Sequence, residues 1–248
     1  MANVDTKGGG PLAGLRLIEM GTLLAGPFCG QLLGDFGAEV IKLEPPGQGD
    51  PMREWGREKS HGMSLWWPVV ARNKKSVTLN LREAEGQAIA RDLIAKSDFL
   101  LENFRPGTLE RWNLSYAELQ KINPRLIMIR VSGFGQTGPY AKRAGFGAVG
   151  EAMGGLRYVC GDPATPPSRM GISIGDSLAA THCLRRRVIG SLLPGTDWSG
   201  PSRGLRHLRG GPQHDGVTRY GVRQDRLRQG AHWRDTAQCC AVQCLPNA

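Results

Sequence analysis

Short apolar runs alternate with segments of helical periodicity over residues 12–182, and this alternation limits the fold of the 248-residue chain more than any other feature. Strand-like runs cover 15–20, 38–44, 76–81, 99–101 and 126–131, and helical patterns cover 26–37, 83–96 and 116–122. Apolar strands separated by helices are typical of a Rossmann-like, mainly parallel sheet with flanking helices. We therefore expect an α/β fold, with ligands bound beyond the carboxyl ends of the strands.

The composition of the chain changes near His182. Residues 1–182 hold 21 Lys and Arg against 18 Asp and Glu, whereas residues 183–248 hold 11 Arg and no Lys against four Asp and no Glu. We predict an organised α/β region over 1–182 and a disordered, Arg-rich tail over 183–248, because the tail has few regularly spaced apolar residues. The tail charge favours nucleic-acid binding as an alternative function, but regularly interleaved aromatic residues are absent, so no specific nucleic-acid partner is expected.

Other patterns exclude several classes of protein. No apolar stretch reaches the roughly 18 residues of a transmembrane helix, and the first ten residues lack the apolar core of a signal peptide. Cys239, Cys240 and Cys244 lack the paired spacing of a metal site. We expect a cytoplasmic protein without membrane contact, bound metal or permanently bound cofactor.

Some residues have two interpretations. The glycines of 26–37 and the basic residues Arg72, Lys74 and Lys75 could contact phosphates, but helix packing and surface solvation are the commoner roles. Asp176 follows a short apolar run, and a helix-like Ser-Leu-Ala-Ala segment comes after it. The pattern favours Asp176 as a helix N-cap. A carboxylate at such a strand-to-helix corner is also a candidate nucleophile, and the two roles are compatible.

Several motifs together resemble the family III CoA-transferases, the CaiB/BaiF family that includes formyl-CoA transferase and carnitine CoA-transferase. These motifs are Leu-Ala-Gly-Leu-Arg-Leu-Ile-Glu-Met at 12–20, Ala-Gly-Pro-Phe-Cys at 25–29, the segment 33–46, Asn-Lys-Lys-Ser-Val-Thr-Leu-Asn-Leu at 73–81, Glu-Asn-Phe-Arg-Pro-Gly at 102–107, the segment 132–140, and Gly-Asp at 175–176. They keep the family's order and spacing over residues 12–182.

The resemblance implies an enzyme that moves CoA from an acyl-CoA thioester to a free carboxylic acid. The nucleophile of the family falls on Asp176, which would form a mixed acyl anhydride and then an aspartyl-CoA thioester. The CoA contacts of the family fall on Leu24, Leu79, Asn103, Phe104 and Arg111. Formyl-CoA transferase has a CoA-contacting arginine where this chain has Pro45. CoA thioester is a substrate in this scheme, alongside the acid.

An acyl-CoA racemase-like activity is the alternative within the same superfamily. Its mechanism needs a histidine base in the segment 144–148, facing an aspartate across the substrate. The matching residue in this chain is Phe146, which cannot transfer a proton. The residues therefore favour the transferase.

The resemblance stops after His182, and the tail is consistent with a shifted reading frame. Permitted codons for the residues from Asp197 onward, read one base downstream, spell a continuation that begins TGQGQVVDSAIYEA and resembles family members. We therefore expect an insertion of one base, or a loss of two, near codons 182–197. The chain would then be a truncated family member with an incomplete α/β domain and doubtful activity, lacking the parts that interlock two subunits into the family homodimer.

Overall fold

The structure is a computed structural model that describes residues 9–162, 164–184 and 241–245. The chain divides into two units. In the described residues, the first unit comprises 9–103 and 108–128, and the second comprises 104–107, 129–162, 164–184 and 241–245. The predicted tail over 183–248 and its frame change lie outside the described residues, apart from 183, 184 and 241–245.

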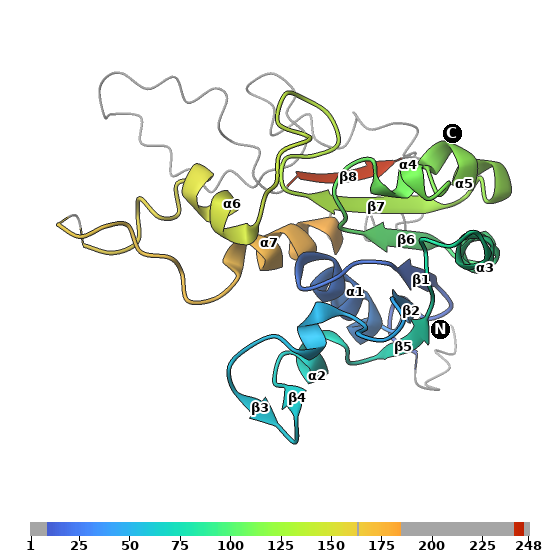
Figure 1. Ribbon diagram of the computed structural model, residues 1–248, viewed down its shortest axis with the longest axis horizontal. Coiled ribbons are helices and arrows are strands. Elements are labelled where there is room, and N and C mark those ends of the chain that lie inside the picture. Colours follow the sequence, from blue (N-terminus) through green and yellow to red (C-terminus); the bar gives the residue numbers. More distant parts are fainter. Residues whose placement is uncertain (1–8, 163, 185–240, 246–248) are drawn as a thin grey trace, which may run out of the picture. The chain divides into compact units, whose positions relative to one another are not determined.

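The first unit contains most of the strands and helices (Figure 1). In chain order these are β1 (Arg16–Glu19), α1 (Ala25–Asp35), β2 (Glu39–Glu44), the short 3-10 helix η1 (Pro51–Arg53), β3 (Lys59–Ser60), β4 (Met63–Ser64), α2 (Trp67–Val70), β5 (Lys74–Thr78), α3 (Ala84–Ala95), β6 (Phe99–Glu102), α4 (Thr108–Arg111) and α5 (Tyr116–Ile122).

Four of these strands form a parallel sheet in the order β5-β2-β1-β6. Ile18 of β1 pairs with Ile41 of β2 on one side and with Leu100 of β6 on the other. The β6 strand is buried along its whole length, and Leu17 and Ile18 of β1 are also buried. Burial on both faces explains the neighbouring apolar residues in these two strands. This confirms the predicted α/β fold with a mainly parallel sheet.

Helix α1 packs against β1 and β2, as Figure 1 shows. Gly37 follows its C-cap with a φ of +97°, a left-handed conformation that glycine adopts without strain, so the predicted end of this helix is confirmed. The strand predicted at 76–81 lies earlier, at 74–78, because Lys74 and Lys75 take part in the ladder with Val40 and Ile41. Their charge hid the start of the strand.

The second unit contains α6 (Gly147–Met153), α7 (Ile174–Cys183) and β8 (Ala241–Leu245). Strand β7 (Ile127–Ser132) begins in the first unit, where the Ile127 amide donates to the Asp98 carbonyl, and continues into the second unit beside β8. Helices α6 and α7 pack against each other. No helix in the described residues is long and apolar enough to cross a membrane.

Candidate active site

Asp176 is the third residue of α7 rather than its N-cap, so that prediction was wrong. Ser173 is the N-cap, and its carbonyl accepts a hydrogen bond from the Ser177 amide at 3.0 Å, so the helix has already begun before Asp176. The strand expected before it is replaced by a tight turn, in which the Ile174 amide donates to the Ile172 carbonyl. A carboxylate in the first turn of a helix interacts favourably with the helix dipole.

Gly147, the first residue of α6, lies against the Asp176 carboxylate. A Cβ atom built on Gly147 would be 2.7 Å from Asp176 Oδ2, and one built on Gly175 would be 3.1 Å from the Gly147 carbonyl oxygen. The two glycines therefore let the beginnings of α6 and α7 approach closely. This contact fixes where the carboxylate lies within the second unit.

Two charged side chains act on Asp176. Burial raises the pKa of Asp176, Arg169 lowers this pKa in part, and the negative charge of Glu151 raises it further. The Arg169 Nε atom is 3.8 Å from Glu151 Oε1, and Glu151 is fully buried. The net result is a carboxylate whose pKa lies above the usual value for aspartate, under the influence of one cation and one second carboxylate.

Phe146 immediately precedes α6 and is 68% exposed. The resemblance predicts a histidine base here in a racemase, and the Phe146 side chain has no proton to exchange. Its neighbour Gly147 contacts Asp176, so this segment is the one that faces the carboxylate. The geometry gives the racemase alternative no base on this segment.

The predicted CoA-contacting residues fall in both units. Leu24, Leu79, Asn103 and Arg111 belong to the first unit, whereas Phe104 belongs to the second, as Asp176 does. Leu79 and Phe104 are half-buried, and the Leu79 amide donates to the Glu44 carbonyl. Arg111 is exposed and donates from Nη2 to Thr108 Oγ1 at 3.0 Å.

Asn103 holds the loop that follows β1. Its Oδ1 accepts from the Thr22 amide at 2.7 Å, and its Nδ2 donates to the Thr22 carbonyl at 2.8 Å. Leu24 follows in the same loop, but its side chain is buried in an apolar cluster with Met52 and Val70. The structure thus brings Asn103 to the loop of Leu24, and a CoA contact from Leu24 would come from its backbone.

Sequence reasoning missed a buried ion cluster within the sheet and the loop after β2, formed by Glu19, Lys42, Asp50 and Lys74. Lys42 Nζ is 2.9 Å from Glu19 Oε1 and 2.7 Å from Asp50 Oδ2, and Lys74 Nζ is 2.8 Å from Glu19 Oε2. All four side chains are at most 2% exposed. The surface role expected for Lys74 was therefore wrong, and the available signal was the presence of charges within apolar strands.

The buried ion cluster also shapes the loop after β1. Lys42 Nζ donates to the Gly21 carbonyl at 2.8 Å, and Asp50 Oδ1 accepts from the Leu23 amide at 3.0 Å. Leu23 has a φ of +61°, which costs energy for a non-glycine residue, so the loop needs such fixed partners. Burial opposes the charge on Lys42, but Glu19 and Asp50 outweigh this effect and raise the pKa of Lys42.

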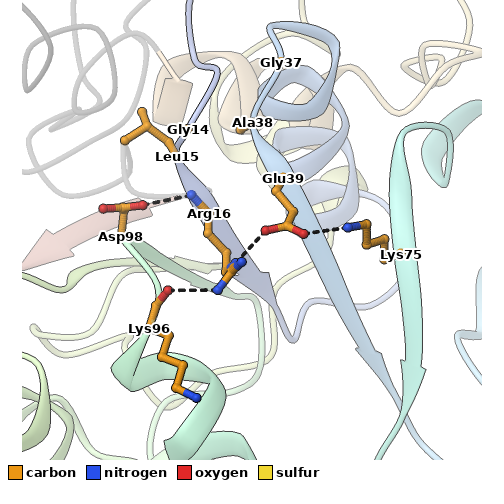
Figure 2. Close-up of a pocket in the computed structure, with 9 residues that line it drawn as sticks. All are labelled: Gly14, Leu15, Arg16, Gly37, Ala38, Glu39, Lys75, Lys96 and Asp98. Atoms are coloured by element: carbon orange, nitrogen blue, oxygen red, sulfur yellow. Dashed lines mark hydrogen bonds and ion pairs between the residues drawn. The ribbon is translucent and has the colours of Figure 1, made fainter. Parts of the chain in front are cut away.

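A cavity of about 630 Å³ lies at the opposite edge of the sheet, at the amino ends of the strands. Figure 2 shows that its charged lining residues pair with one another: Glu39 contacts both Arg16 and Lys75, and Asp98 accepts from the Arg16 amide. The Glu39 and Asp98 carboxylates are therefore already engaged by partners within the chain. We therefore place the candidate nucleophile at Asp176, in the second unit, rather than at this cavity. Among the described residues, no group of His, Cys, Asp and Glu side chains is arranged to hold a metal ion.

Comparisons with known proteins agree with these features. The model of CoA-transferase family III matches residues 12–186. Succinyl-CoA--D-citramalate CoA-transferase of Chloroflexus aurantiacus is 67% identical over 171 residues, which cover 69% of this chain and 42% of that protein. Succinyl-CoA:glutarate CoA-transferase of Mus musculus is 42% identical over 166 residues, which cover 67% of this chain and 38% of that protein.

Solved structures give the same result. A CAIB/BAIF family protein from Brucella suis superposes with a TM-score of 0.66 at 37% identity, covering 74% of this chain and 51% of that one. The Rv3272 protein of M. tuberculosis gives a TM-score of 0.69 at 31% identity, with the same coverage. The chain spans less than half the length of the two curated relatives. The family match over residues 12–186 shows that this chain belongs to CoA-transferase family III.

Proposed function

We propose that the protein transfers CoA between an acyl-CoA thioester and a free carboxylic acid, with Asp176 as the nucleophile. The observation that carries this proposal is the position of Asp176, a half-buried carboxylate held against the glycine backbone of α6 in a chain of this family. No other group is required to form the covalent intermediate, because an ionised carboxylate is itself nucleophilic.

The proposed transfer passes through covalent intermediates on Asp176. An Asp176 oxygen attacks the thioester carbonyl carbon, the carbon–sulfur bond breaks, and CoA leaves as a thiolate, so that a mixed anhydride forms. The thiolate then attacks the Asp176 carbonyl carbon and releases the first acid as its carboxylate. The second carboxylate attacks the carbonyl carbon of this aspartyl-CoA thioester, the carbon–sulfur bond breaks, and a second mixed anhydride forms. The released thiolate attacks the acyl carbon of that anhydride, the bond between this carbon and the Asp176 oxygen breaks, and the new acyl-CoA leaves with Asp176 again a carboxylate.

Burial of Asp176 serves this chemistry. A partly desolvated carboxylate is held less tightly by water than an exposed one, and its raised pKa makes it a stronger base. Arg169 opposes the increase in this pKa, so that the ionised form stays accessible. Attack requires the ionised form of Asp176. The rate of CoA exchange should therefore fall as the pH decreases through the pKa of Asp176, which lies above the usual value for aspartate.

We also propose that the acids exchanged are dicarboxylic. The names of the relatives from Chloroflexus aurantiacus, Mus musculus and Agrobacterium fabrum specify succinyl-CoA or succinate, with citramalate, malate or glutarate as the other acid. Each of these compounds has two carboxyl groups. The CoA moiety is assigned to Leu24, Leu79, Asn103, Phe104 and Arg111, and the loop that Asn103 fixes supports this assignment.

An isotope-exchange assay tests the proposed function. The full chain is incubated with unlabelled succinyl-CoA and labelled succinate, and we expect label to enter succinyl-CoA without added metal or nucleotide. Absence of exchange would contradict the proposal for this chain. Exchange of the α-proton of an acyl-CoA with deuterated water, without CoA transfer, would instead support the racemase alternative.

The tail over 183–248 is proposed to be encoded out of frame, as the back-translation indicates. Fresh sequencing of the coding DNA through codons 182–197 checks this proposal. A read that restores the family-like continuation would support it, and a confirmed reading frame for the present tail would refute it.

A further inference from the structure

Arg169 lies beside two carboxylates in the second unit. Its Nε atom is 3.8 Å from Glu151 Oε1, a distance too long for a hydrogen bond. Glu151 is fully buried, and neither of its carboxylate oxygens accepts a hydrogen bond from the residues that the structure describes. The Arg169 side chain is 53% exposed, so its guanidinium can be reached from solvent while it faces a buried negative charge.

Glu151 is also linked to Asp176 through helix α6. Glu151 follows Gly147 by one helical turn of α6, so the two residues share a face of the helix, and Gly147 contacts the Asp176 carboxylate. Consistent with this placement, Arg169 and Glu151 are the two charges that shift the pKa of Asp176 after burial. We call Glu151, Arg169 and Asp176 the Asp176 cluster, and when its members are ionised it has one excess negative charge.

This excess charge creates a problem for a dicarboxylic substrate. An acyl group such as succinyl, bound to CoA through one end, still has an ionised carboxylate at the other end. That carboxylate would be repelled by Glu151 and Asp176 unless a cation paired with it. Arginine presents several N–H donors in a planar fork that matches a carboxylate, and Arg169 is the cation of the Asp176 cluster.

The geometry points to Arg169 as the residue that binds the distal carboxylate of a dicarboxylic acyl group while Asp176 attacks the thioester end. This inference rests on the proposed function for the role of Asp176, but the binding of a dicarboxylate by Arg169 can be measured without catalysis. Glu151 has a positioning role, because its buried charge attracts the Arg169 guanidinium. The predicted consequence is selectivity for acids with a second carboxylate over acids of the same length without one.

Titration calorimetry of the full chain with succinate and with butyrate tests this inference, since the two acids have equal chain length and differ in the second carboxylate. We expect the unsubstituted chain to prefer succinate, and Arg169→Gln to weaken succinate binding by about 10- to 100-fold while butyrate binding changes little. Arg169→Lys, which keeps the charge but loses the fork, should give an intermediate affinity.

Arg143→Gln is the matched control, because it removes the same charge from an exposed arginine of the same unit that lies over the Tyr140 ring. It should leave the succinate preference intact. Circular dichroism confirms that each variant is folded. The inference is overturned if the unsubstituted chain binds succinate no better than butyrate, or does not bind it, or if Arg169→Gln keeps the preference.

The isotope-exchange assay separates this inference from the proposed function. A succinate preference that disappears in Arg169→Gln, in a chain without CoA exchange, would support dicarboxylate binding and contradict the transferase. Exchange that proceeds equally well with succinate and butyrate would support the transferase and overturn the role of Arg169.

Discussion

Replacement of Asp176 by asparagine is expected to reduce CoA exchange by about 10⁴-fold or more, the scale seen when a covalent nucleophile is removed. Asparagine has nearly the same shape as aspartate, so the contact with Gly147 is kept while the nucleophilic charge is lost. Exchange of labelled succinate into succinyl-CoA measures the rate. Mass spectrometry of the unsubstituted chain after incubation with succinyl-CoA should show an adduct on the peptide with Asp176, and the variant should show none.

A smaller change at the neighbouring Gly147 should reduce CoA exchange by less than the loss of Asp176. In Gly147→Ala the new methyl group would lie 2.7 Å from Asp176 Oδ2, so the carboxylate must move away from its position although its charge is kept. The rate should fall, but less than in Asp176→Asn, because the nucleophile is displaced rather than lost. If Asp176→Asn exchanges CoA at the rate of the unsubstituted chain, Asp176 is not the nucleophile.

Replacement of Lys42 by methionine is expected to lower the free energy of unfolding by about 3–5 kcal/mol, because removal of one partner leaves buried charges without compensation. Lys42 is the shared partner of Glu19 and Asp50, and both of these carboxylates are almost completely buried. The change also removes the hydrogen bond to the Gly21 carbonyl, so the loop after β1 should loosen. Urea unfolding followed by circular dichroism measures the loss.

Lys75→Met is the matched control, since Lys75 lies in β5 directly after Lys74 and pairs with Glu39 at a largely exposed position. An exposed ion pair contributes little to stability, so Lys75→Met should lower the free energy of unfolding by less than about 1 kcal/mol. The double variant Lys42→Met with Asp50→Asn should recover part of the stability, because it removes one uncompensated charge. Equal costs for Lys42→Met and Lys75→Met would show that the buried ion cluster does not stabilise the chain.

The periodicity of the sequence predicted most strands and helices of the sheet, and it failed where charge or glycine interrupts the pattern. The apolar residues of β1, β2 and β6, among them Leu17, Val40 and Leu100, are buried, so these strands could be recognised from the sequence. The beginning of β5 could not be recognised from the sequence because Lys74 and Lys75 are charged residues, although the Lys74 side chain is buried. The turn before Asp176 was taken for a strand because Ile172 and Ile174 are β-branched.

The candidate site was predictable only in part. Asp176 followed from the resemblance of the whole motif set, not from its immediate neighbours, which favour an N-cap. Glu151 and Arg169 carry no local signal, because their proximity depends on the packing of α6 beside α7 and on the segment between them. Phe146, in contrast, could be interpreted from its residue type alone, since the absence of a titratable group needs no geometry.

The position of β1 between β2 and β6 has a consequence for the synthesis of the protein. As the chain leaves the ribosome, β1 can pair with β2 soon after both have emerged, but its other edge remains open until β6 has been made. During that interval an apolar strand with unpaired amide and carbonyl groups is available to other nascent chains. Completion of the sheet in the first unit therefore has to wait for synthesis of β6, and association through the open edge of β1 competes with it until then.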